Sequence, residues 1–216
     1  MKILRGLFLV LLGLVALFFV TGVFLPQTAH VERSMTTTAS PATVYSLVDG
    51  FKHFNEWSPW AGLDPATKYA YSGPETGVGA RMEWVSANPD VGSGSQEVIA
   101  VEPGHRVMSR LDFGMDNPTT STISLVPEGT GTRVTWTLDT DFSGSLIGRY
   151  FGLALDRMVG PDYEKGLAQL KAVAESTTPA NAPPISAPAT EADANDQPAA
   201  VASPTGQETP VPPMPQ

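Results

Sequence analysis

The chain has 216 residues, twenty prolines, no cysteine and a formal net charge of −9. Without cysteine it has no disulfide, no thiol nucleophile and no cysteine-ligated metal site. The acidic balance, with no basic stripe, removes the electrostatic attraction on which nucleic-acid binding depends, so we expect no nucleic-acid partner.

The three histidines, His30, His53 and His105, lie far apart in the sequence. None has the spacing of a zinc-binding motif such as H-x-x-x-H or H-E-x-x-H. We therefore expect surface or interface histidines, no metal site and no other cofactor.

Residues 1–27 are expected to form a transmembrane anchor. Residues 7–25 carry no charge, and nineteen helical residues span about 28 Å, close to the hydrocarbon thickness of a bilayer. Lys2 and Arg5 precede this apolar run, and the first charge after it is Glu32. Positive charge on the N-terminal side predicts a single-pass protein with its N-terminus in the cytoplasm and its domain on the periplasmic or extracytoplasmic side.

A cleaved signal peptide is the competing interpretation of the same segment. Signal peptides have shorter apolar regions and end in a small-x-small site. Here Val20-Thr21-Gly22 and Thr28-Ala29 offer only weak cleavage sites, which favours a retained anchor. Both interpretations predict export.

Residues 28–176 are expected to form one globular domain. Its first strand is predicted over residues 30–38, because β-branched and alternating residues dominate there. Ser40 and Pro41 then give the start signal of a short helix that ends at Gly50. A second short helical or irregular piece follows over residues 51–60.

Six further strands are predicted before residue 141, separated by turns rich in Gly, Pro, Asn and Asp, as an antiparallel meander requires. Their sequences are KYAYSG, ARMEWVS, SQEVIAVEP, HRVMSRLDF, TSTISLVP and TRVTWTLD. In the second of them Met82 and Trp84 alternate with Arg81 and Glu83, so one face is apolar. The sheet therefore has one buried side that another element must cover.

Residues 145–175 are the only long helical candidate for that cover, because apolar residues recur there at helical spacing. Gly160-Pro161 is expected to bend or break this helix midway. The order of elements predicts an α+β fold, a curved seven-stranded antiparallel sheet wrapped around a long C-terminal helix.

Residues 177–216 are rich in proline and alanine and contain no aromatic or basic residue. Such a segment cannot bury enough apolar surface to offset its chain entropy, so we expect a disordered tail.

Several motifs resemble one known group of domains. They are SPATVYSLV (40–48), WSPW (57–60) followed by Asp64-Pro65, GVGARMEW (77–84), GTRVTW (131–136) and DRMVGPDYEKGLAQLK (156–171). Together with the order of elements, they resemble the START-like, polyketide-cyclase and lipid-transport superfamily (SRPBCC), in particular its membrane-tethered bacterial members. The resemblance covers about residues 28–176. It implies a helix-grip fold with a cavity that holds a hydrophobic molecule, and it leaves the activity open.

The expected ligand-lining residues are the tryptophans and the apolar residues on inward strand faces and on the long helix, although ordinary core packing explains such residues equally well. They are Trp57, Trp60, Met82, Trp84, Leu111, Phe113, Ile123, Trp136, Phe151, Leu155 and Met158, with Leu125 and Val159 as further candidates.

No catalytic residue is predicted. By strand alternation Glu83, Arg110 and Asp112 face solvent, and Asp156 fits a helix surface. No serine lies in a G-x-S-x-G motif.

The sequence thus predicts a membrane-tethered, non-enzymatic module that binds a lipid or other hydrophobic small molecule. Two alternatives remain open: an enzyme of the cyclase or hydratase kind that uses the same cavity, and an interaction domain for another envelope protein. No feature of the sequence identifies a protein partner.

Overall fold

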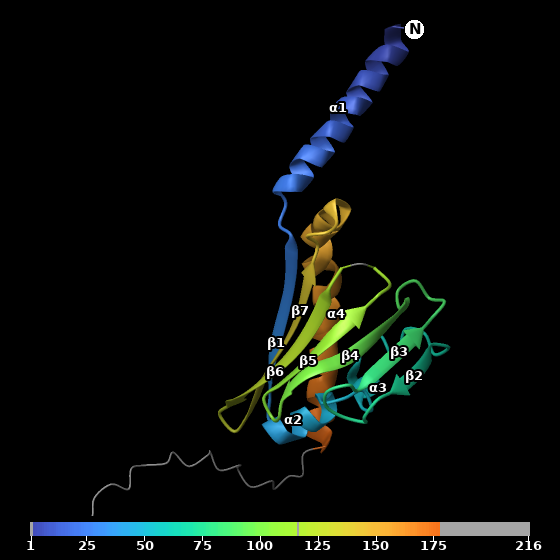
Figure 1. The fold of residues 1–216 in the computed structure, drawn as a ribbon. Coiled ribbons are helices and arrows are strands. Elements are labelled where there is room, and N and C mark those ends of the chain that lie inside the picture. The colour runs from blue at the N-terminus through green and yellow to red at the C-terminus, as the bar shows by residue number, and fades with distance from the viewer. Residues whose placement is uncertain (1, 116, 178–216) are drawn as a thin grey trace, which may run out of the picture. The chain divides into compact units, whose positions relative to one another are not determined.

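The fold is a long sheet packed against one long helix, in the order that the sequence predicts (Figure 1). The computed structural model describes residues 2–115 and 117–177. The helices are α1 (Lys2–Phe24), α2 (Pro41–Val48), α3 (Phe54–Trp57) and α4 (Leu146–Thr177). The strands are β1 (Thr28–Thr37), β2 (Lys68–Ser72), β3 (Arg81–Val85), β4 (Ser93–Glu102), β5 (Arg106–Asp112), β6 (Thr119–Glu128) and β7 (Gly131–Asp141).

The seven strands form a single antiparallel sheet in the order β1-β7-β6-β5-β4-β3-β2. Strands β2 to β7 are a meander of sequential neighbours, and β1 joins its far edge by pairing Thr28 with Asp141. The curved sheet wraps around α4 (Figure 1). The predicted α+β helix-grip fold is therefore confirmed.

Alternation along the strands places the core on the side that faces α4. In β7, Val134, Trp136 and Leu138 are buried, whereas Arg133 between them and the turn is exposed. Period-two alternation puts such residues on opposite faces of a strand, so the one-sided sheet inferred from the sequence is present.

The short helices close one end of the core. The Ser40 hydroxyl accepts a hydrogen bond from the Thr43 backbone N–H at 3.2 Å, and Pro41 occupies the first turn of α2. This cap satisfies a backbone donor that the helix itself cannot. The indole of Trp57, at the end of α3, donates to the Leu47 carbonyl at 3.1 Å and so fastens α3 to α2.

Helix α4 runs through Pro161 without interruption, so of the bend or break expected at Gly160-Pro161 the break does not occur. Proline removes one helical hydrogen bond, but Leu155 before it and Tyr163 after it are both buried against the sheet. The contacts of both halves with one curved surface hold the helix together across the defect.

Because Gly160 has no side chain, the Arg33 side chain of β1 can lie directly against α4 at this position. A Cβ built at Gly160 would come within 2.0 Å of the Arg33 Nη2. From this position Arg33 pairs with Asp156 at 2.8 Å and with Glu164 at 2.7 Å. The arginine therefore clamps the edge strand to the helix on either side of Pro161.

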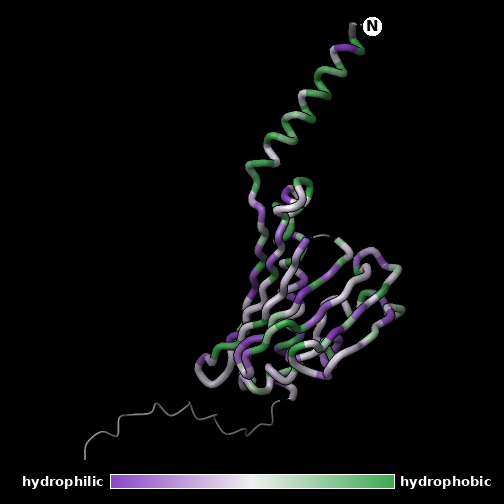
Figure 2. Tube along the Cα trace, viewed as in Figure 1, coloured by the Kyte–Doolittle hydropathy of each residue, from purple (hydrophilic) through white to green (hydrophobic). Residues whose placement is uncertain are grey.

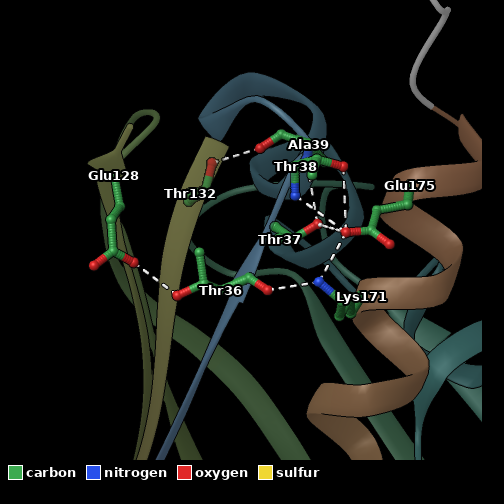
Figure 3. A network of polar contacts seen from close by, with 8 residues as sticks. All are labelled: Thr36, Thr37, Thr38, Ala39, Glu128, Thr132, Lys171 and Glu175. Carbon is green, nitrogen blue, oxygen red and sulfur yellow. Dashed lines mark hydrogen bonds and ion pairs between the residues drawn. The ribbon is translucent and has the colours of Figure 1, made fainter. Parts of the chain in front are cut away.

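A polar network joins the end of β1 to the last turns of α4 (Figure 3). Glu175 Oε1 accepts hydrogen bonds from the Thr37 hydroxyl at 3.0 Å and from the Thr38 backbone N–H at 3.1 Å. Lys171 Nζ lies 2.9 Å from the same carboxylate and donates to the Thr36 carbonyl at 2.7 Å. The hydrogen bond from Lys171, followed by the backbone N–H of Thr38, lowers the pKa of Glu175 to about 2.

Helix α1 is apolar along almost its whole length (Figure 2). Over Ile3–Phe24 its mean hydropathy is 2.8, and it is long and apolar enough to cross a membrane once. Only Leu25, Pro26 and Gln27 separate it from β1. The predicted tail lies outside the described residues except for Thr177, the last residue of α4.

Candidate ligand pocket

A pocket of about 250 Å³ lies between the concave face of strands β2 to β5 and the middle of α4. Aromatic and aliphatic side chains make most of its wall. Its lining residues are Phe54, Trp60, Tyr69, Met82, Trp84, Asp90, Val91, Gln96, Leu111, Phe113, Val159 and Asp162. Apolar walls with a few polar groups are typical of small-molecule sites.

Two larger hollows, of about 390 and 780 Å³, lie elsewhere on the domain. The first surrounds the β2–β3 turn and includes Lys52 and Arg81, and the second covers the ends of β5 and β6 and includes Arg110 and Asp112. Charged side chains and turns in these walls indicate solvated surface, so neither is the better ligand site.

The register of the strands explains the pocket wall. Met82 on β3 pairs with Gln96 on β4, and Gln96 pairs with Leu111 on β5. Neighbouring residues in register share one face of a sheet. These three side chains therefore form a row across the concave face, with a single amide between two apolar groups.

Trp84 covers the strand beside it because its partner in register is a glycine. A Cβ at Gly94 would lie 2.7 Å from the Trp84 ring and 2.7 Å from the Asp112 carbonyl oxygen. The indole N–H donates to the Val91 carbonyl at 3.3 Å. On its other side the ring meets Phe113 edge to face, with centroids 5.9 Å apart. Gly94 lies within β4 and makes room for this tryptophan.

A smaller void of about 20 Å³ lies deeper in the core and shares Phe54 and Gln96 with the pocket. Its other walls include Ser109, Ser121 and Trp136. Such a volume has room for about one water molecule, and a polar lining is what a buried water needs. Gln96 therefore lines both the pocket and this smaller void, in which Ser109 and Ser121 are the other polar residues.

An aromatic cluster closes the core behind this void. The Trp136 indole stacks on Tyr163 and meets Trp57 edge to face at 5.4 Å, while its N–H donates to the Ser121 hydroxyl at 2.7 Å. Burial raises the pKa of Tyr163 well above its ordinary value. The tyrosine is thus a neutral structural group, since general-base chemistry would require a lower pKa.

Three polar residues line the pocket itself. The Gln96 amide is half-buried and makes no side-chain hydrogen bond within the described residues. Asp90, in the β3–β4 loop, is exposed, and Asp162 on α4 is half-buried. Neither carboxylate has an ion-pair partner in the part of the chain that the structure describes. No group of three or more metal-ligating residues occurs in residues 2–115 and 117–177.

The structure gathers five of the eleven predicted residues in the pocket wall: Trp60, Met82, Trp84, Leu111 and Phe113. Three others, Trp57, Ile123 and Trp136, line the small void instead. The three from α4 lie outside both. Phe151 packs on Phe142, Leu155 is buried in the core and Met158 is 54% exposed.

Of the further candidates, Val159 lines the pocket and Leu125 is buried in the core. Six lining residues were not predicted: Phe54, Tyr69, Asp90, Val91, Gln96 and Asp162. Phe54 belongs to an apolar pattern that could have marked it. Gln96 could have been marked by strand alternation, because it lies two residues before the buried Val98 and so on the same face of β4. Asp90 and Asp162 carry no local signal, because a loop and a helix surface bring them to the pocket only in three dimensions.

The charges considered in the sequence for catalysis, Glu83, Arg110, Asp112 and Asp156, do not line this pocket. Asp156 instead pairs with Arg33, which lowers the pKa of its carboxyl. The pocket is nevertheless not free of charge, because Asp90 and Asp162 stand in its wall.

Comparison with known proteins agrees with this architecture. Residues 28–175 match the family described as polyketide cyclase / dehydrase and lipid transport, and the chain belongs to that family. No curated protein matches the chain.

Solved structures share the fold at low sequence identity. A protein from Thermobifida fusca is 19% identical with a TM-score of 0.53, and the match covers 68% of this chain and 93% of that one. The di-domain ARO/CYC protein StfQ from the steffimycin biosynthetic pathway is 12% identical with a TM-score of 0.53, over 69% of this chain and 51% of that one. A protein from Nitrosospira multiformis is 23% identical with a TM-score of 0.49, over 66% and 94%.

Proposed function

We propose that this protein is a membrane-tethered, non-enzymatic module that binds a hydrophobic small molecule in the pocket between the sheet and α4. One observation carries the proposal. The pocket has about 250 Å³ of space behind aromatic walls, whereas ordinary cores are packed with few voids larger than a water molecule. Membership of a lipid-transport family supports the same function.

The size of the pocket limits the ligand. Sites for drug-sized molecules usually measure about 300–1,000 Å³, so this one is at or below the lower end of that range. It fits one ring system or a short chain. A whole diacyl lipid is too large.

The absence of a catalytic pair favours binding over turnover. A general base needs a partner or an environment that tunes its pKa. Among the described residues no histidine, lysine or arginine lines the pocket, and both lining carboxylates reach solvent. The pocket therefore has the walls of a binding site without the paired groups of an active site.

A cyclase or hydratase is the second candidate, because Asp162 is half-buried in the wall and unpaired within the described residues. An enzyme of that kind would use Asp162 as its base. Replacement by asparagine would then abolish turnover of the natural ligand while leaving its binding intact. If the protein only binds its ligand, the same compound is recovered unchanged from the wild type and from the asparagine variant.

The arrangement of the strands supports a ligand that comes from the membrane. The β3–β4 loop with Val91 and the β5–β6 loop with Phe113 line the pocket. Through the antiparallel pairs these loops are at the same end of the sheet as Thr28, the first residue of β1. That end follows directly on α1, so a molecule leaving the bilayer meets the pocket loops first.

Contacts at the start of α4 support the tether. The Tyr150 ring stacks on Phe18 with centroids 4.4 Å apart, and its hydroxyl donates to the Phe18 carbonyl at 2.6 Å. Phe18 lies six residues before the end of α1, which is about 9 Å along the helix axis. If α1 spans the bilayer, Tyr150 reaches interfacial depth, where tyrosine is favoured. Ile147 and Leu153, 72% and 62% exposed, are apolar neighbours on the same helix.

The test is to purify the full chain in mild detergent, extract it with organic solvent and identify by mass spectrometry what co-purifies. Trp84→Ala, which opens the pocket wall, is the matched variant. The proposal expects a compact hydrophobic compound with the wild type and a strongly reduced amount with the variant. Equal amounts with both proteins, or none with either, would count against the pocket as the binding site.

A further inference from the structure

The pocket contains one hydrogen-bonding group that the protein itself does not use. Gln96 is the only polar side chain in the row Met82-Gln96-Leu111, and its amide makes no hydrogen bond to any described residue. The side-chain atoms of Gln96 are not shut off from water, so water can satisfy the amide until a ligand with its own hydrogen-bonding group takes that place. The nearby recess offers Ser109 and room for about one water. The inner end of the pocket thus matches an uncharged group that donates or accepts hydrogen bonds.

The two charged groups in the pocket wall are both negative. Asp90 and Asp162 have no cationic partner within the described residues, unlike Asp156 and Glu175, which pair with Arg33 and Lys171. Two uncompensated carboxylates near an apolar, low-dielectric wall create a negative potential. Such a potential repels carboxylate and phosphate groups and attracts an ammonium.

The aromatic walls act in the same direction. Trp60, Trp84 and Phe113 present ring faces or edges to the pocket. A cation near the face of an aromatic ring is attracted by the ring quadrupole, most strongly for tryptophan. The carboxylates repel an anion, and the Trp84 N–H, a possible donor to one, already donates to the Val91 carbonyl.

On these grounds we propose that the ligand is a compact hydrophobic amine: an aromatic or alicyclic body, an uncharged hydrogen-bonding group that meets Gln96, and an ammonium group beside Asp90 and Asp162. This inference rests on the proposed binding function and specifies the class of ligand. It excludes free fatty acids and phosphorylated lipids as ligands of this pocket.

The test uses three indoles that share one body and differ only in the charge of the side arm. Tryptamine is the cation, tryptophol the neutral compound and indole-3-propionate the anion. Each is titrated by calorimetry into the full chain in mild detergent at low salt. The expected order of affinity is tryptamine, tryptophol, indole-3-propionate, with about a tenfold range, which is what one interaction of about 1.4 kcal/mol gives.

Variants separate the contributions of the polar groups. Asp90→Asn combined with Asp162→Asn is expected to compress the range to less than about threefold while leaving the affinity for tryptophol unchanged. Gln96→Leu is expected to weaken the binding of all three compounds by about fivefold, which corresponds to the loss of one typical hydrogen bond. Glu83→Gln removes the same charge from the opposite face of β3 and is expected to change nothing.

The possible failures are distinguishable. Indole-3-propionate binding as tightly as tryptamine, or a range unaffected by the double Asn variant, overturns this inference and leaves the proposed function standing. If none of the three binds and no compound co-purifies with the chain, the proposed function falls, and this inference with it.

Discussion

Trp136 of β7 and Tyr163 of α4 stack with ring centroids 3.8 Å apart and planes inclined by 13°. This pair joins the centre of the sheet to the helix that the sheet wraps, and both side chains are almost fully buried. Neither ring lines the pocket, so the aromatic groups of this protein divide into a structural set around Trp136 and a pocket set around Trp84.

Trp136→Ala is therefore expected to lower the free energy of unfolding by about 3–5 kcal/mol, the usual cost of removing a buried aromatic ring. Urea unfolding followed by circular dichroism checks the value. A loss below about 1 kcal/mol would show that the stacked pair is not part of the core.

Trp84→Ala is expected to cost less stability than Trp136→Ala and to weaken ligand binding more, because Trp84 is only half-buried and lines the pocket. Trp136→Ala should thus have the larger effect on stability, and Trp84→Ala should have the larger effect on ligand binding. Equal effects on stability and on binding would remove the distinction between the two sets.

Gly94→Ala is expected to weaken ligand binding by displacing Trp84. The added methyl would lie 2.7 Å from both the indole ring and the Asp112 carbonyl oxygen, so the ring or the strand must move. The affinity for tryptophol measures the effect. Gly92→Ala is not a suitable control, since Gly92 has a positive φ of 63°; Gly62→Ala, where a Cβ meets no atom within 4 Å, is the better one.

Glu175→Gln is expected to lower the melting temperature at pH 7 and to have a diminishing effect in acid. Its pKa falls from an ordinary 4.5 to about 2 in the folded protein. A lowered pKa gives stability that is fully present above the unfolded value and is lost as the pH falls toward the folded value. The gap in melting temperature between wild type and variant should therefore close between about pH 4.5 and pH 2. A gap independent of pH would contradict the ion-paired network of Figure 3.

Deletion of residues 2–24 is expected to release the protein from membranes. The full chain should remain in the membrane pellet after washing at alkaline pH, because the apolar surface of α1 stabilises insertion. A full chain that is extracted by alkaline washing, or that loses α1 during export, would show that the helix is a signal sequence rather than an anchor.

The sequence predicted the fold well because each element has a local signal. Alternation of Met82 and Trp84 with charged neighbours specified the inward face of β3, and the apolar spacing around Tyr163 and Leu167 specified the buried face of α4. The helix break that the sequence allowed at Pro161 does not occur, because burial of residues on both sides offsets the local preference of proline, and no local pattern reports that burial.

The candidate site was predicted less completely for a related reason. A large aromatic side chain has the same pattern whether it fills the core, as Trp136 does, or borders a space, as Trp84 does. Which of the two occurs depends on volumes contributed by several strands, and in particular on Gly94, whose missing side chain leaves room for an indole. That Asp162 lines the pocket depends on how α4 packs over the sheet, which the sequence pattern does not specify.

The most direct measurement of the central claim is the set of four indole N–H signals in an NMR titration of the full chain in lipid nanodiscs. With tryptophol as ligand, the signals of Trp60 and Trp84 are expected to shift. The signal of Trp57, whose N–H donates to Leu47 away from the pocket, should stay in place. A titration that leaves Trp60 and Trp84 unmoved, or that shifts Trp57 as much as Trp84, would contradict ligand binding in this pocket.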